Sequence, residues 1–544
     1  MLRSILDLTL SPRTFAELGY PGLVGGCINL MKTVKFSNHI SPFRYEYGYL
    51  CFRILTIAFG VCFLQRAKVF DAAVARMRAE PETDLLVVFS EEVSQLVRTL
   101  ISDDQGIDRC DWMLGLRAPK RSFGPPQMPF AAGHGPMELM NMLSSGQKYF
   151  AKVMGSTYSP SILGVLCLCW RYVKLCQDRV IENNEPYLVS MFCLTYFRYC
   201  LVSPACDGDV LVLMYDRNPE LWGKAKQSFI DDQDERDKYL SYNKRSKPTD
   251  VRWFSQLSVS LMPIILQFLL SRVPDGIEGL LPRLFGLTID RLWEARLGNQ
   301  VSCDELIKIA ADTMTFLGRA LECLIEKKYL NQSMICEIID VLIHHDLFDF
   351  IAQTAFSLPM RPKGLPRAED PNMKFIEQSV WMWEHVGKIL PKELLRSKFL
   401  AILPDLQKYI AYALQWTYMG EDITARWDRF RLMSQSVVCI GYVVGLQNEL
   451  QDVHEKTGFC AWARCADPVQ REILLFACDE CGVTYCSRNC LARDWMYGDM
   501  RKWHRLSCGN VFPLKVDIPW GFVDRMTREL TEGPNRFPIE NFLH

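Results

Sequence analysis

The sequence predicts a mostly α-helical protein, with a large all-α region followed by a small cysteine-rich C-terminal module. Three observations support this prediction. Apolar residues recur at three- and four-residue steps over long segments, which is the period of a helix with one buried face. Period-two alternation is scarce, so we expect no large sheet. Eight cysteine and histidine side chains gather in close pairs between residues 460 and 508.

The first clear helical segments are expected at residues 161–181 and 187–201, with a short connection through Pro186. The uncharged run from Trp253 to Ser271 is long enough to span a bilayer. It contains four serines, two glutamines and Pro263, so we predict a buried helix instead. The uncharged run at residues 54–65 is too short to span.

The strongest helical pattern covers residues 302–329. Ser302 and Glu305 form a capping-box pattern at its start. The helical period continues through Leu306, Ala310, Thr313, Leu317, Leu321 and Leu324. Residues 334–350, 394–418 and 424–450 are expected to be helical for the same reason. Successive antiparallel helix pairs of this kind would suit an irregular solenoid.

Three segments interrupt the helical pattern. Residues 102–136 are rich in Gly and Pro and are predicted to form a long loop. Residues 216–250 are heavily charged and suggest a linker or an exposed helix, and residues 357–373 hold four prolines. The expected organisation is a helical region at 1–215, the charged segment at 216–250, a second helical region at 251–450, the cysteine-rich module at 455–510 and a tail at 511–544.

Composition indicates an ordinary globular chain in a reducing compartment. The net charge of −1 gives no general attraction to nucleic acid or to an anionic membrane. Fourteen of the 21 cysteines lie upstream of the C-terminal cluster, mostly in apolar helical surroundings. The N-terminal stretch carries Asp7 and Pro12 where a secretion signal needs an apolar core. We therefore expect an intracellular protein, in the nucleus or the cytoplasm, and no membrane partner.

The cysteine-rich cluster has the spacing of metal ligands. Zinc prefers four tetrahedral ligands drawn from Cys thiolate and His nitrogen, so eight ligands fill two closed sites. Closed sites leave no coordination position for substrate and are structural. The sequence thus predicts two structural Zn²⁺ ions, held by the pairs Cys460/Cys465, Cys478/Cys481, Cys486/Cys490 and His504/Cys508.

The run CDECGVTYCSRNCLARDW, with the closing WHRLSC, resembles the MYND zinc finger. The resemblance implies a cross-brace, in which Cys460, Cys465, Cys486 and Cys490 hold the first zinc and Cys478, Cys481, His504 and Cys508 the second. Spacing alone also allows the first four and the last four ligands to pair in sequence. The first pair and the stretch before His504 are both longer than is usual in the family.

The resemblance also implies a protein partner. MYND fingers are similar in offering a shallow groove to short proline-containing peptides, which would place Trp495, Leu491 and Asp479 at the binding surface. The module has a net charge of −2 once two zinc ions and seven thiolates are included, so direct nucleic-acid binding is not expected. Trp495 could equally be a core aromatic of a small finger. The sequence therefore predicts a non-catalytic interaction or adapter protein.

The alternative is an enzyme whose active site lies in the helical region, because MYND fingers also accompany methyltransferases and hydroxylases. The fragment Ser37–Pro42 only faintly resembles the asparagine–histidine motif of the methyltransferases. His344 and Asp346, with His385 as a distal histidine, have the spacing of an iron site made of two histidines and one carboxylate. The helical period around them favours histidines at the end of a packed helix instead.

Overall fold

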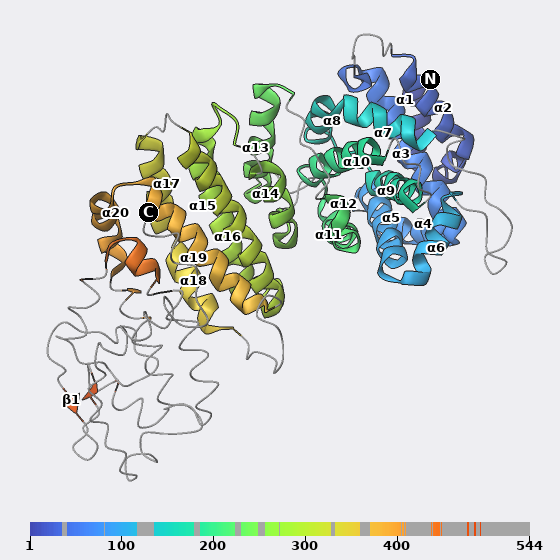
Figure 1. The fold of residues 1–544 in the computed structure, drawn as a ribbon. Helices are drawn as coiled ribbons and strands as arrows, with labels where there is room; N and C mark the ends of the chain where they lie inside the picture. Colours follow the sequence, from blue (N-terminus) through green and yellow to red (C-terminus); the bar gives the residue numbers. More distant parts are fainter. Residues whose placement is uncertain are drawn as a thin grey trace. The chain divides into compact units, whose positions relative to one another are not determined.

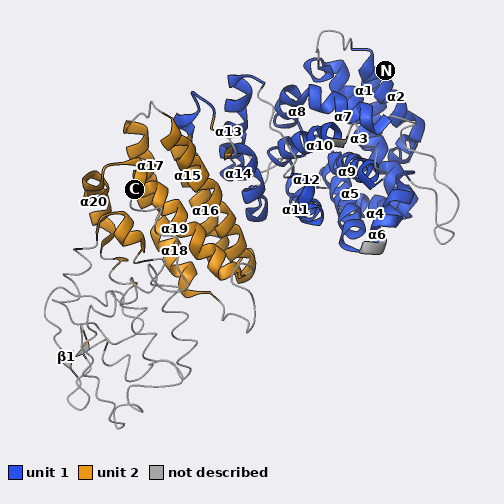
Figure 2. Ribbon diagram, in the orientation of Figure 1, with its two compact units in different colours: residues 1–269, 274–280 blue, residues 270–273, 281–544 orange. Residues whose placement is uncertain are grey.

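The protein is mostly helical and forms two compact units (Figures 1 and 2). The computed structural model describes most of the chain up to Leu403 and a few short pieces beyond it. The described ranges are 1–34, 41–80, 82–116, 135–178, 185–222, 230–248, 256–270, 273–327, 332–358 and 370–403, with 405–406, 409, 437, 439–446, 448, 476–477, 484–485 and 490. Unit 1 comprises residues 1–269 and 274–280, and unit 2 comprises residues 270–273 and 281–544.

Unit 1 is a helical assembly in which α3 (Glu46–Ala67) is the central helix. Almost every side chain of α3 from Cys51 to Leu64 is buried, because α3 packs against α2, α5 and α9 on different sides. The helices of unit 1 are α1 (Leu2–Leu6), α2 (Pro21–Lys32), α3, α4 (Phe70–Ala79), α5 (Leu85–Ser102), α6 (Asp104–Met113), α7 (Gly135–Ser145), α8 (Gln147–Met154), α9 (Ile162–Asp178), α10 (Glu185–Cys200), α11 (Ala205–Arg217), α12 (Pro219–Trp222), α13 (Asp232–Ser246) and α14 (Met262–Leu270, whose last residue is assigned to unit 2).

Among the described helices, α3 alone is both long enough and apolar enough to cross a membrane. Its length exceeds that of the uncharged run at 54–65, because the helix continues past Arg53 and Arg66 into flanking sequence. The apolar window of α3 is 78% buried inside the protein, which is the environment of a core helix.

Two of the segments that were predicted to interrupt the helical pattern contain buried helices, so the prediction for them is corrected. Residues 104–113, expected within a long loop, form α6, which packs against α5 and α3. In the charged stretch 216–250, α13 is neither a linker nor an exposed helix, since one of its faces is buried at Asp234, Tyr239 and Tyr242. The division between the two units falls near residues 270–280 and not in this stretch.

The charges of α13 can be buried because they are neutralised by partners within unit 1. Asp231 caps the helix by accepting from the backbone N–H of Asp234 at 2.8 Å. The side chain of Asp234 accepts two hydrogen bonds from Arg198 of α10, at 2.7 and 2.6 Å. A paired and hydrogen-bonded charge avoids most of the cost of burying an isolated one. Sequence periodicity alone does not reveal such pairing, which explains the wrong expectation of exposure.

Unit 2 is built around a long helix pair. Its most extensive helix–helix interface joins α16 (Cys303–Glu326) to α19 (Pro371–Ile389). The other helices of unit 2 are α15 (Leu281–Leu297), α17 (Gln332–His344), α18 (Leu347–Phe356) and α20 (Lys392–Phe399). Two short strands near the C-terminus, β1 (Phe476–Ala477) and β2 (Thr484–Tyr485), form an antiparallel pair.

The predicted start of α16 is confirmed. Ser302 is the N-cap residue, and its Oγ accepts from the backbone N–H of Glu305 at 3.2 Å. Residues 334–350 are helical as predicted, but a break divides them, because α17 ends at His344 and α18 begins at Leu347. Asp346 adopts a left-handed conformation between them (φ 53°, ψ 40°), which a continuous α-helix does not allow.

The other helical predictions are confirmed where the structure describes them. The segments at 161–181 and 187–201 correspond to α9 and α10, and the apolar run at 253–271 contains the buried α14. Of the segment at 394–418, α20 is described, and of the segment at 424–450 a short helical piece at 439–443 is described. Residues 400–403, 405–406 and 409 of the first segment and 437, 444–446 and 448 of the second are also described, and the other positions lie outside the described residues.

Gly318 permits the close approach of α16 and α19, and this contact is open to test. A Cβ at Gly318 would overlap the ring of Trp381 on α19, where Cε3 would lie at 2.7 Å. We expect Gly318→Ala to destabilise unit 2 by about 1–2 kcal/mol, because overpacking outweighs the better helix propensity of Ala. Chemical denaturation followed by tryptophan fluorescence measures the change.

Gly26→Ala on α2 is the matched control. No atom lies within 4 Å of a Cβ at Gly26, so the substitution should stabilise by about 0.5–1 kcal/mol through helix propensity alone. A stabilising effect at Gly318 as well would show that α19 does not approach α16 as closely as described.

Candidate functional site

The β1–β2 pair is the described part of the predicted zinc module. Phe476 pairs with Tyr485, and Ala477 pairs with Thr484, in antiparallel register. The chain therefore reverses direction between Ala477 and Thr484. Tyr485 is fully buried, which is unusual for so short a segment unless other groups pack on it.

This register relates the hairpin to three of the predicted zinc ligands. In the sequence, Cys478 directly follows Ala477, and Cys486 directly follows Tyr485. Cys478, Cys481 and Cys486 themselves lie outside the described residues. The cross-brace and the sequential pairing both assign Cys478 and Cys486 to different ions, so the register of β1 and β2 does not distinguish the two pairings.

One predicted ligand is itself described. Cys490 is helical and only 6% exposed. The other seven ligands lie outside the described residues, as do the predicted peptide-binding residues: Cys460, Cys465, Cys478, Cys481, Cys486, His504, Cys508, Trp495, Leu491 and Asp479. Within the described part of the chain, no group of three or more His, Cys, Asp or Glu side chains is placed to hold a metal ion.

The donor set of the module fits zinc by its chemistry. Seven thiols and one imidazole are the ligands of closed tetrahedral sites, and a hairpin turn carrying a C-x₂-C pair is a common way to present two thiolates to one ion. A segment of this size buries too little apolar surface to fold alone. Metal binding would therefore supply much of the folding free energy of the module.

The residues proposed for an iron site are not arranged as one. His344 ends α17, and Asp346 lies between α17 and α18, with a carboxyl pKa that burial and Asp349 raise. His385 lies on α19, where its Nδ1 is 2.8 Å from the carbonyl oxygen of Trp381. Its Nε2 is 4.0 Å from the carboxylate of Glu322 on α16. These contacts are those of histidines within packed helices.

The neighbouring His345 was not proposed as a site residue from the sequence. It lies closer to a carboxylate than His385 does. Its Nδ1 lies 2.6 Å from Oδ1 of Asp290 on α15, and its carbonyl oxygen accepts from the indole N–H of Trp293 at 3.1 Å. Gly286 on α15 gives the His345 ring room, since a Cβ there would lie 2.7 Å from Nε2. His345 therefore ties α15 to the joint between α17 and α18.

Unit 1 holds a buried polar cluster around Asp207 of α11. The carboxylate of Asp207 accepts hydrogen bonds from Tyr199 at 2.5 Å and from Ser94 of α5. Burial raises the pKa of Asp207, although these hydrogen bonds lower it. Burial also lowers the pKa of Arg245 on α13 to about 10. The cluster connects α5, α10 and α11 within the core.

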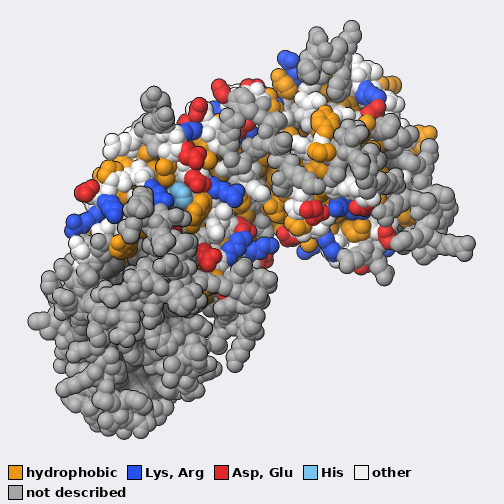
Figure 3. Space-filling model, viewed as in Figure 1, with side chains coloured by type: hydrophobic (Ala, Val, Ile, Leu, Met, Phe, Trp, Pro, Cys, Tyr) orange, Lys and Arg blue, Asp and Glu red, His pale blue; other side chains and the backbone are white. Residues whose placement is uncertain are grey.

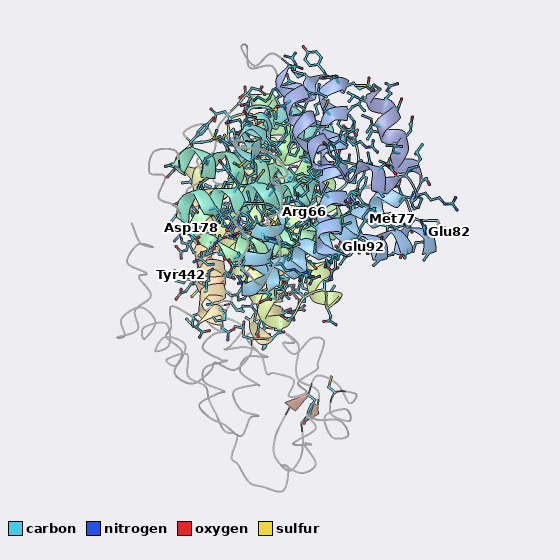
Figure 4. All side chains as sticks on the ribbon, turned by 90° about the vertical axis from the view of Figure 1, so that its right-hand side faces the viewer. Arg66, Met77, Glu82, Glu92, Asp178 and Tyr442 are labelled. Atoms are coloured by element: carbon cyan, nitrogen blue, oxygen red, sulfur yellow. The ribbon has the colours of Figure 1, made fainter. Side chains whose placement is uncertain are left out.

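Other ion pairs fasten individual helices of unit 1. Arg171 of α9 binds Asp111 of α6 through two hydrogen bonds, at 2.8 and 3.1 Å, and both side chains are buried. On the surface, Arg76 of α4 bonds Glu92 of α5 at 2.9 Å; Figure 4 shows Glu92 near Met77 of α4. The carboxylates of Asp111 and Glu92 thus form ion pairs that hold neighbouring helices together.

None of the fourteen upstream cysteines, all of which the structure describes, forms a disulfide. Eight of them are buried, and burial raises the pKa of such thiols, for example that of Cys169 to about 12. The Sγ atoms of Cys110 and Cys167 lie 3.8 Å apart between α6 and α9. The eight buried thiols fill core positions.

A small cavity lies in unit 2 and is named the Trp383 cavity here. Its volume is about 10 Å³, and its walls include Leu342, Phe348, Trp383 and Phe399 with the carboxylates of Asp346, Asp349 and Asp405. This volume holds one water molecule at most, far below the few hundred cubic ångströms of a substrate pocket. The Trp383 cavity is therefore not a substrate site.

No family model, curated protein or solved structure matches this chain. The function must therefore be argued from the residues themselves.

Glu384 on α19 provides a pH-dependent test of the packing in unit 2. Burial raises the pKa of its carboxyl group to about 7, partly offset by Lys388. The neighbouring Gly387 lies against Val443, so this part of α19 is covered by the segment 439–446. The folded state thus holds a proton that the unfolded state releases near pH 4.5. We expect the free energy of unfolding to fall between pH 4.5 and 7 and to level off above pH 7.

Glu384→Gln should remove this part of the pH dependence. The variant should be more stable than the wild type at pH 7.5 and should approach it as the pH falls toward 4.5. Denaturation midpoints across this range provide the measurement, with Glu393→Gln on the exposed start of α20 as the control. If stability fell equally steeply with pH in the wild type and in Glu384→Gln, the raised pKa of Glu384 would be contradicted.

Proposed function

We propose that this protein is a non-catalytic, zinc-binding adapter. Its C-terminal MYND-like finger would recognise a proline-containing peptide or dock on the helical region of the same chain. The helical units would supply the scaffold or a second binding surface. The observation that carries the proposal is the antiparallel β1–β2 pair within the cysteine-rich segment, where Cys478 directly follows β1 and Cys486 directly follows β2 in the sequence.

Several features of the described helices support a scaffold role. Their buried charges have protein partners, as in the pairs Arg198–Asp234 and Arg171–Asp111. His385 lies 2.8 Å from the carbonyl oxygen of Trp381 within α19, whereas His344 is exposed at the end of α17. On the face seen in Figure 3, the described acidic and basic side chains are interspersed with apolar ones. A mixed surface with a net chain charge of −1 favours a protein partner over nucleic acid.

The first test concerns the metal. We expect the purified chain to contain two Zn²⁺ ions and Cys481→Ala to lose at least one of them, because a tetrahedral site with three ligands binds weakly. Elemental analysis gives the stoichiometry. Far-UV circular dichroism should retain most of its helical signal, since the helices α1–α20 all lie outside residues 455–510 of the proposed finger.

The matched control is Cys303→Ala, which removes an exposed thiol at the start of α16 and should keep both ions. Wild-type protein without stoichiometric zinc would overturn the metal assignment. A loss of helical signal in Cys481→Ala would overturn the independence of the helices.

The second test concerns the partner. Affinity capture with the intact protein and with Trp495→Ala should yield partners that are lost from the variant, because an aromatic wall contributes strongly to peptide binding. Trp503→Ala, in the same module, should retain them if its zinc content is normal. Identical partners from wild type and Trp495→Ala, both with full zinc content, would remove the finger as the binding surface.

A further inference from the structure

Two residues that line the Trp383 cavity each carry a buried polar atom with no hydrogen-bond partner among the residues that the structure describes. Trp383 of α19 is 1% exposed, and its indole Nε1–H has no acceptor there. Asp349 of α18 has a buried Oδ1 without a donor, although the hydroxyl of Tyr409 also interacts with this carboxyl group. Leaving such atoms unsatisfied in the interior is costly, so each requires a physical explanation.

The second oxygen of Asp349 shows that its side chain is held in place. Oδ2 accepts from Nε2 of Gln353, one turn along α18, at 3.4 Å. The unpartnered Oδ1 therefore belongs to a carboxylate with a defined orientation. Trp383 is fixed as well, since its ring packs edge-on against Phe399 of α20, with centroids 5.4 Å apart. Both orphan atoms thus belong to positioned walls of the same cavity.

The chemistry of the two atoms defines what can bind between them. The indole N–H needs an acceptor, and the carboxylate oxygen needs a donor. An ammonium group offers only donors, and a carbonyl group offers only an acceptor. Bare metal ions do not fit either, because no group of three ligands is placed to hold one within the described residues. A water molecule satisfies both atoms, and the volume of about 10 Å³ holds one.

We propose that the Trp383 cavity is a binding site for a single structural water molecule that joins α18 to α19. This water accepts a hydrogen bond from Nε1–H of Trp383 and donates one to Oδ1 of Asp349. Its second hydrogen is directed to the carboxylates of Asp346 or Asp405, which also line the cavity. Three partners is the usual number for a buried water. None of the residues that line the cavity belongs to the predicted zinc module.

A crystal structure of the full chain tests the site directly. We expect one isolated density peak within about 3 Å of both Trp383 Nε1 and Asp349 Oδ1. An empty cavity, a metal ion at that position, or a protein acceptor for the indole N–H would each overturn the proposal. In crystals of Trp383→Phe, which lacks the N–H, the peak should weaken or disappear.

A solution measurement tests the same bridge through its energetics. We expect the effects of Trp383→Phe and Asp349→Leu on the unfolding equilibrium constant to depart from multiplicativity by about threefold or more, because both remove partners of one water. The control cycle combines Trp383→Phe with Asp312→Leu, since Asp312 pairs with Lys374 and does not line the cavity. Multiplicative effects in both cycles would argue against a shared water.

Discussion

Helix-on-helix packing is the constraint on which both units depend. In unit 1, α3 is buried on nearly all sides, so the surrounding helices must present apolar faces to it. In unit 2, α16 and α19 approach so closely at Gly318 that a methyl group would meet Trp381. The hydrophobic burial of these interfaces opposes the conformational entropy of the chain. Buried charged side chains within these interfaces are paired, as Asp234 is with Arg198.

The sequence predicted the helical class and several elements because local signals were strong. The cap formed by Ser302 and the apolar stripe after it define the beginning of α16 without reference to the rest of the protein. The break at Asp346 was missed, because an aspartate in the left-handed region has no local sequence signature within an apolar stripe. The helix α6 was missed because it lies in a segment that is rich in Gly and Pro. For α13 the burial was missed, because its charged residues suggested exposure. Long-range pairing with Arg171 and Arg198 makes the burial of Asp111 in α6 and of Asp234 in α13 acceptable.

The candidate site was predictable in a different way. Ligand spacing in the sequence singles out the eight candidate ligands, and the structure adds an antiparallel strand pair on either side of the C-x₂-C segment. The pairing of the eight ligands is a tertiary property that spacing cannot determine. The contact between His345 and Asp290 is equally tertiary, since the two residues lie 55 positions apart. Gly286 leaves room for the His345 ring, but the sequence alone does not show that a ring lies beside this glycine.

The buried pair between Arg198 of α10 and Asp234 of α13 restricts how this protein can evolve. Removing either side chain alone would strand its partner in the core, at a cost of about 3–5 kcal/mol, whereas replacing both by apolar residues is often harmless. A lineage that passes through the single replacement risks losing the fold. Among descendants of a common ancestor, positions 198 and 234 should consequently change together or not at all, although 36 residues separate them along the chain.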